Sequence, residues 1–179
     1  MKRFVVGFLF LWGVLRVWAC TSAIVTGSLT SDGRPLLWKH RDTSDLNNKV
    51  EKISSPGKLS YVALFNASDS LGREAWMGMN EVGFAIMNTA SYNLKDDDIK
   101  DMDKEGLVMS KALAECHTVD DFARLILLLP KPLGVEANFG VIDAYGGAAY
   151  FETDNWSYKR FDVDGCMVRT NYSYSGRKD

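Results

Sequence analysis

A cysteine that follows an apolar segment has the clearest capacity for chemistry in this sequence. Cys20 comes directly after the segment Phe4–Ala19, and cleavage after Ala19 would give it a free α-amine beside its thiol. A free α-amine has a pKa of roughly 7.7–8.0 and a cysteine thiol about 8.5, so the amine can accept the thiol proton near neutral pH. One residue then supplies nucleophile and base. The two histidines, His40 and His117, form no recognisable triad motif.

The first 19 residues have the layout of a secretory signal peptide. Lys2 and Arg3 give a positive start, an apolar run follows, and Val17 and Ala19 stand three residues and one residue before the cysteine. The apolar run is about a dozen residues, shorter than the roughly 20 that cross a bilayer. We therefore expect residues 1–19 to be removed, with no stable membrane span afterwards, and the mature protein to reach the periplasm or the extracellular space.

Two other uses of Cys20 remain open. "VWAC" approximates a lipobox, although Trp18 stands where a small residue is usual. Acylation of Cys20 would block its amine and its thiol, and would give a non-catalytic lipoprotein anchored at the cell envelope. A disulfide formed by Cys20 would instead indicate a disulfide-stabilised binding domain. We expect the other two cysteines, Cys116 and Cys166, to be small buried residues.

Four short motifs occur in a recognisable order. "CTSAIV" (Cys20–Val25) and "LLWKHRD" (Leu36–Asp42) resemble the start of N-terminal-nucleophile cysteine hydrolases. This superfamily includes choloylglycine hydrolases, penicillin V acylases, acid ceramidase-like amidases and the acyltransferase that processes 6-aminopenicillanic acid. Further on, "GMNEVGFAIMNTASYN" resembles the superfamily's NE-x-G stretch, and "CMVRTNYSYSG" resembles its V-x-T-N strand. The resemblance extends over essentially the whole mature chain.

The resemblance implies roles for residues beyond the nucleophile. Asp42 matches the acid that holds the α-amine, and Asn88 and Asn171 match two asparagines that build the oxyanion hole. Lys39 stands where the superfamily usually has arginine, which keeps the charge but loses the bidentate fork. Arg41, two residues along the same strand face, is the alternative replacement. The implied catalytic residues are Cys20, Lys39, Asp42, Asn88 and Asn171.

The resemblance also implies a reaction and a fold. The sulfur attacks an amide carbonyl to form a thioester, which water or another acceptor then releases. Bile-acid conjugates, penicillins, N-acyl amines and acyl peptides remain open as small-molecule substrates, as does the choice between hydrolase and acyltransferase. No metal or organic cofactor is implied. The expected fold is an α+β, four-layer αββα sandwich that is incomplete in this chain. Superfamily members continue further, so we expect residues 20–179 to be the N-terminal part of one truncated domain.

Charge and length exclude some classes of function. Three of the 21 basic residues lie in the predicted signal peptide, which leaves 18 against 23 acidic residues, or a net charge of −5. A mildly acidic chain gives no indication of nucleic-acid binding. About 160 residues are enough for one domain with one core. The oligomeric state is left open.

The elements that must position these residues follow from periodicity. Thr118 and Asp121 form a capping box for a helix over 119–129, which Pro130 ends. A second helix is expected over 107–116, after a solvated acidic loop over 95–106. Strands before and after two helices indicate an α+β domain. The expected strands are 21–25, 36–42, 60–67, 83–90, 138–144, 148–154, 156–163 and 166–175. Expected core residues are Trp38, Trp76 and Phe84.

Overall fold

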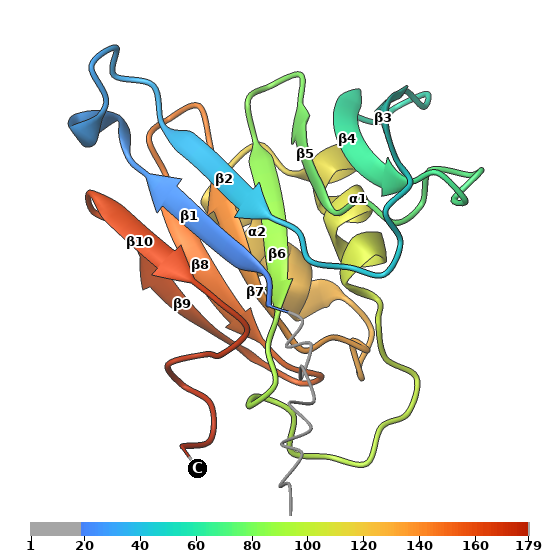
Figure 1. The fold of residues 1–179 in the computed structure, drawn as a ribbon. Helices are drawn as coiled ribbons and strands as arrows, with labels where there is room; N and C mark the ends of the chain where they lie inside the picture. The colour runs from blue at the N-terminus through green and yellow to red at the C-terminus, as the bar shows by residue number, and fades with distance from the viewer. Residues whose placement is uncertain (1–18, 179) are drawn as a thin grey trace, which may run out of the picture.

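The computed structural model describes residues 19–178 as two antiparallel sheets and two α-helices (Figure 1). The smaller sheet has the strand order β10-β1-β2, and the larger sheet runs in sequence order from β3 to β9. The strands of the smaller sheet are β1 (Thr21–Val25), β2 (Leu36–His40) and β10 (Cys166–Arg169). Those of the larger sheet are β3 (Asn48–Ile53), β4 (Tyr61–Asn66), β5 (Met77–Asn80), β6 (Ala85–Ala90), β7 (Ala137–Ile142), β8 (Ala148–Thr153) and β9 (Tyr158–Asp162). The helices are α1 (Glu105–Glu115) and α2 (Val119–Leu128), with a short 3₁₀ helix η1 (Gly27–Leu29) between β1 and β2.

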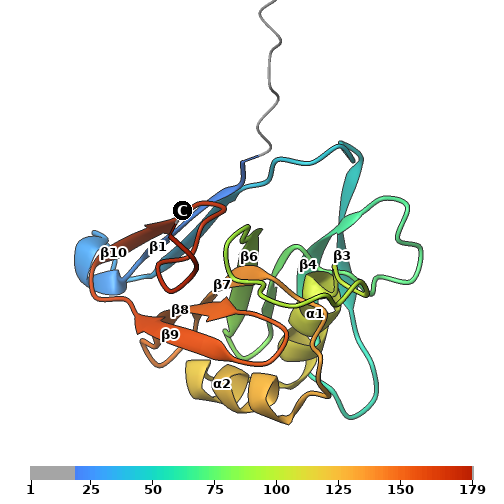
Figure 2. The same ribbon diagram turned by 90° about the horizontal axis from the view of Figure 1, so that it is seen from below.

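The larger sheet is the middle layer of the molecule. Figure 2 shows the two helices against one of its faces and the smaller sheet against the other. On the helix side, the Phe122 ring of α2 lies 5.6 Å from that of Phe139 and 5.1 Å from that of Phe151. Between the sheets, Ile24 packs with Met87 and Tyr150. Because both faces are covered, every residue of β7 and β8 is buried.

The predicted α+β sandwich is confirmed, with three layers instead of four in the described residues. No helix within residues 19–178 covers the outer face of the smaller sheet. Leu36 and Trp38 on that face are 55% and 54% exposed, so the prediction of a core position for Trp38 is wrong. The reason is strand alternation: Leu37 packs inward and therefore turns its neighbours outward. Cys166 is also exposed, contrary to expectation, whereas Cys116 is buried as expected.

Local sequence signals place the helices well. The Thr118 hydroxyl accepts from the amide of Asp121, and the Asp121 carboxylate accepts from the amide of Thr118, which confirms the capping box. The helix α2 ends at Leu128, two residues before Pro130. The helix α1 begins two residues earlier than predicted, so Glu105 and Gly106 are buried helical residues and not part of a solvated loop.

Three features of the sheets differ from the predicted strands. The predicted set omits β3, an edge strand whose residues are mostly exposed or half-buried, and β5, a four-residue strand with turn-like composition. The strand β10 ends at Arg169, and the following residues lie against the larger sheet. There the Glu152 carboxylate accepts from the amides of Tyr174 and Ser175 at 2.8 Å. After Arg169, side-chain bonds and single backbone bonds, such as that from the Tyr92 amide to the Asn171 oxygen, hold the chain in place of a strand ladder.

The predicted signal peptide, residues 1–19, lies outside the described residues except for Ala19. Within residues 19–178, no helix is both long enough and apolar enough to cross a membrane.

Candidate active site

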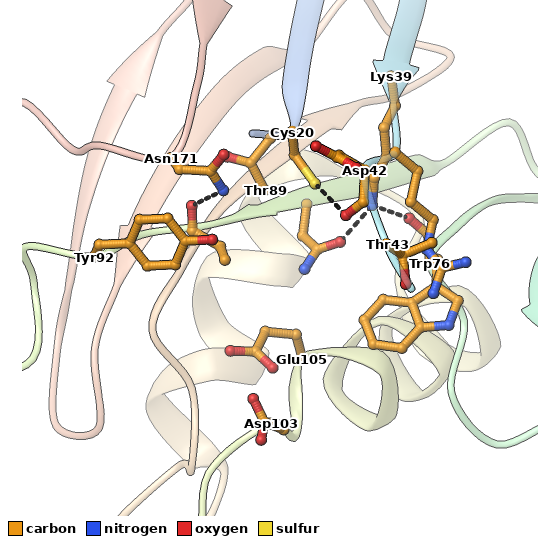
Figure 3. A pocket seen from close by; sticks show the side chains of 13 residues that line it. Cys20, Lys39, Asp42, Thr43, Trp76, Thr89, Tyr92, Asp103, Glu105 and Asn171 are labelled. Carbon is orange, nitrogen blue, oxygen red and sulfur yellow. Dashed lines mark hydrogen bonds between the residues drawn. The ribbon is translucent and has the colours of Figure 1, made fainter. Parts of the chain in front are cut away.

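All five predicted catalytic residues line one cavity of about 180 Å³ (Figure 3). The cavity lies where β1 begins, β2 ends and β10 ends, over the middle of the larger sheet. Cys20 directly precedes β1, and Asp42 follows β2 by two residues. Other lining residues are Arg41, Thr43, Trp76, Thr89, Ala90, Tyr92, Asp103 and Glu105.

Strand register brings the predicted nucleophile, Cys20, close to Asp42. Thr21 is opposite His40, and Ser22 is opposite Lys39, so the chain before β1 runs beside the chain after β2. The thiol of Cys20 donates to the backbone oxygen of Asp42 over 3.7 Å. The Asp42 carboxylate accepts from the amide of Ala19 at 2.9 Å. The carboxylate therefore lies one residue from the nitrogen that becomes the α-amine when the Ala19–Cys20 bond is cut.

The Cys20 thiol is not part of a disulfide, and the three cysteines are all free. Cys166 is opposite Val25 at the far end of β1. Five residues of strand separate Val25 from Cys20, which is roughly 16 Å at 3.3 Å per residue. A disulfide requires Cα atoms no more than about 7 Å apart. Cys116 lies at the end of α1, on the other side of the larger sheet. Cys20 therefore reaches neither partner.

Lys39 fixes the orientation of the Asn88 amide. Its ammonium donates to Asn88 Oδ1 at 2.7 Å and to the backbone oxygen of Trp76 at 2.9 Å. Because an ammonium only donates, the atom that faces it must be the amide oxygen. The Asn88 nitrogen is thereby left to donate elsewhere in the cavity. The pKa of Lys39 is lowered to about 7, and burial is the largest cause. The nearby Arg41 also lowers this pKa, whereas Cys20 and Glu105 raise it.

Arg41 is turned toward a different part of the fold. Its guanidinium donates to Asn48 Oδ1 at 2.6 Å and to Asn66 Oδ1 at 2.7 Å, across the paired strands β3 and β4. It also lies 4.8 Å from the centre of the Trp76 ring. Of the two basic residues, Lys39 is thus the one that contacts a predicted oxyanion residue.

Asn171 is positioned by the chain that follows β10. Its nitrogen donates to the backbone oxygen of Ala90 at 3.0 Å, and its buried Oδ1 has no partner within the described part of the chain. The neighbouring backbone oxygen of Thr170 accepts from Thr89 Oγ1 and from Asn138 Nδ2. Asn138, where a predicted strand begins, is fully buried and holds this segment against β6 and β7.

Sequence patterns did not identify Glu105 as a cavity residue. It is 8% exposed, and its Oε1 accepts from the amide of Glu136 at 3.0 Å. Burial raises its pKa to about 7. Gly106 allows the necessary close packing, because a Cβ there would lie 2.7 Å from the Cβ of Glu74. Trp76, expected in the core, packs against the main core but also forms a wall of the cavity.

Comparisons with known proteins concern the fold. Neither a protein-family model nor a curated protein sequence matches the chain. Among solved structures, the N-acylethanolamine-hydrolyzing acid amidase ortholog of Caenorhabditis elegans superposes with a TM-score of 0.61 at 12% identity, over 86% of this chain and 70% of that one. A mutant of the conjugated bile acid hydrolase of Clostridium perfringens superposes with a TM-score of 0.57 at 17% identity, over 83% of this chain and 52% of that one. Both are N-terminal-nucleophile hydrolases.

The chain has the N-terminal-nucleophile hydrolase fold. The predicted resemblance is confirmed at this level. The chain spans about half the length of the bile acid hydrolase and 70% of the length of the amidase ortholog. Cys20 directly precedes the first strand of the smaller sheet and borders the cavity described above.

Proposed function

We propose that the chain belongs to an exported amidase that cleaves linear amides through a thioester on Cys20. The observation that carries this proposal is the convergence in one cavity of the Cys20 thiol, the Asp42 carboxylate and an Asn88 amide whose oxygen is held by Lys39. Each group has a role in acyl transfer. A thiol alone would support many functions, but these neighbours supply what a thiol needs to attack a carbonyl.

The first step requires removal of the residues before Cys20. The free α-amine then takes the thiol proton, and the Asp42 carboxylate stabilises the ammonium that results. The thiolate attacks the amide carbonyl, and its electrons move onto the carbonyl oxygen. The Asn88 nitrogen donates to that oxyanion, with Lys39 keeping the amide in the donating orientation.

The tetrahedral intermediate then collapses. The C–N bond breaks, the amine leaves with the proton held by the Cys20 ammonium, and an acyl thioester remains. In the second half of the reaction the α-amine accepts a proton from water, the hydroxide attacks the thioester, and the acid and the thiol are released. Another amine in place of water would make the protein an acyltransferase. Every proton that moves passes through the α-amine, so no histidine is needed.

The test uses the full-length, leader-cleaved protein with a panel of amides and mass spectrometry of Cys20. We expect a mass increase on Cys20 that equals the acyl group, and loss of this adduct and of most turnover in Cys20→Ser with an unchanged circular dichroism spectrum. The intact mass also decides the lipoprotein alternative, because a diacyl addition on Cys20 would leave no attacking group. Wild-type activity in Cys20→Ala would reject the proposal.

A further inference from the structure

The end of the cavity away from Cys20 is formed by two carboxylates. Figure 3 shows Glu105 and Asp103 close to each other, on the opposite side of the cavity from the nucleophile. Glu105 is buried and uses Oε1 to accept from the amide of Glu136. Asp103 and Glu136 both act on Glu105 as like charges. This end of the cavity therefore concentrates negative charge.

The cations of the cavity are already engaged by other groups. Lys39 is within electrostatic range of Glu105, but its ammonium donates to Asn88 and to the Trp76 backbone. Arg41 donates to two asparagines of β3 and β4. Within residues 19–178, no salt bridge neutralises either Glu105 or Asp103. Asp103 is exposed, but Glu105 is buried, and a buried carboxylate without a counter-ion is costly. A cationic ligand would remove that cost.

A second observation also calls for hydrogen-bond donors on the ligand. Asn171 lines the same cavity, is 4% exposed, and leaves its buried Oδ1 without a partner in the described residues. The N–H of a substrate amide is a suitable donor for it. The cavity of about 180 Å³ is also smaller than the roughly 300–1,000 Å³ of sites for drug-sized ligands, so it holds a short group.

We propose that the substrate is a short amide with a primary ammonium group, which Glu105 and Asp103 bind at the end of the cavity opposite Cys20. The inference rests on the proposed amidase function and names its substrate class. An ammonium provides three donors and one positive charge, which matches two carboxylates. A fatty acyl chain would leave the buried Glu105 carboxylate unpaired and would cover the exposed Asp103 carboxylate without pairing it. Glu105 is the specificity-determining residue in this scheme, since it is the more buried of the two.

The test compares amides that differ only by an ammonium in place of a methyl group. One pair, N-(2-aminoethyl)acetamide and N-propylacetamide, places the difference on the amine side. The other, 3-aminopropanamide and butanamide, places it on the acyl side. Binding is measured by NMR titration at pH 8 with the full-length, leader-cleaved Cys20→Ser protein, and kcat/KM with the wild type. We expect about 10- to 100-fold tighter binding of the ammonium member in at least one pair.

Glu105→Gln keeps the acceptor for the Glu136 amide and removes only the charge. In the Cys20→Ser background it should abolish the preference for the ammonium and change binding of the neutral member less than about threefold. Asp98→Asn, at an exposed carboxylate of the same acidic segment, is the matched control and should keep the preference. Equal affinity within both pairs, or a preference that survives Glu105→Gln, overturns the inference.

Failure of this inference and failure of the amidase proposal give different results. A thioester on Cys20 with neutral amides, without ammonium preference, retains the amidase and rejects the ammonium site. An ammonium preference that depends on Glu105, without any thioester, retains the site and rejects the amidase.

Discussion

The buried ammonium of Lys39 should make the stability of this protein rise with pH above neutrality. Burial lowers the pKa of Lys39 from 10.5 to about 7, so the unfolded chain binds a proton that the folded chain releases between these values. Stability rises with pH wherever the unfolded state binds more protons. One pKa unit corresponds to 1.36 kcal/mol, so the full rise between pH 7 and 10.5 is about 5 kcal/mol. Lys39→Met keeps the length of the side chain and removes this contribution.

The assay is urea unfolding at several pH values between 7.5 and 9.5. Over these two pH units the free energy of unfolding of the wild type should gain about 2.7 kcal/mol relative to Lys39→Met. The variant also loses the donor to Asn88 Oδ1. That loss lowers the free energy of unfolding by the same amount at every pH, so it does not change the slope of stability against pH. Glu105 has a pKa raised to about 7, which lowers stability as pH rises from 4.5 to 7, so a window above 7.5 separates the two groups.

Lys100→Met, at an exposed lysine, is the control. Its free energy of unfolding should change with pH in parallel with that of the wild type. If the wild type and Lys39→Met gave parallel curves, Lys39 would titrate at its ordinary pKa, and the account of a desolvated ammonium at the cavity wall would be wrong.

Three further predictions concern the oxyanion donor, the buried ion pair and the helix cap. Asn88→Ala should lower the rate of thioester formation about 10²- to 10³-fold with an unchanged fold, and a smaller effect would exclude Asn88 as the donor. Glu152→Gln leaves the fully buried Arg169 without its carboxylate 3.3 Å away and should lower the free energy of unfolding by about 3–5 kcal/mol, whereas Glu51→Gln, in a surface pair, should cost less than about 1 kcal/mol. If urea unfolding showed equal losses of free energy for Glu152→Gln and Glu51→Gln, the buried pair would be no more stabilising than the surface pair. Thr118→Ala should cost about 1 kcal/mol through the lost cap, and a change in kcat would show that α2 acts on the cavity.

Local signals in the sequence predicted the parts of the site that depend on neighbouring residues. Cys20 precedes β1 and Asp42 follows β2, and the antiparallel pairing of these consecutive strands brings them together. The capping box at Thr118 is likewise a pattern over four residues. The roles predicted for Asn88 and Asn171 came from the resemblance of the ordered motifs and not from periodicity, because an asparagine in a strand has no distinctive signal of its own.

The parts that sequence patterns missed depend on packing between distant segments. Glu105 stands in an acidic run that favours a solvated loop, and it is buried only because α1 packs closely against Glu74 and Glu136. Trp38 alternates like a core residue, but alternation does not tell which face of a strand is covered. Arg169 is buried because Tyr150 and Tyr174 enclose its guanidinium, and these residues come together only in the folded molecule.

The pairing of β1 with β10 has a consequence for when the cavity around Cys20 is assembled. Ser22 is opposite Arg169, and its hydroxyl reaches the Arg169 backbone oxygen across 147 positions of the chain. Contacts between such remote segments form late and slowly, since a long loop must close first. While the chain emerges from the ribosome, Cys20 therefore lacks Asn171 until nearly everything between them has been synthesised. A polypeptide that ends before residue 171 therefore carries the Cys20 thiol without the Asn171 side of the cavity.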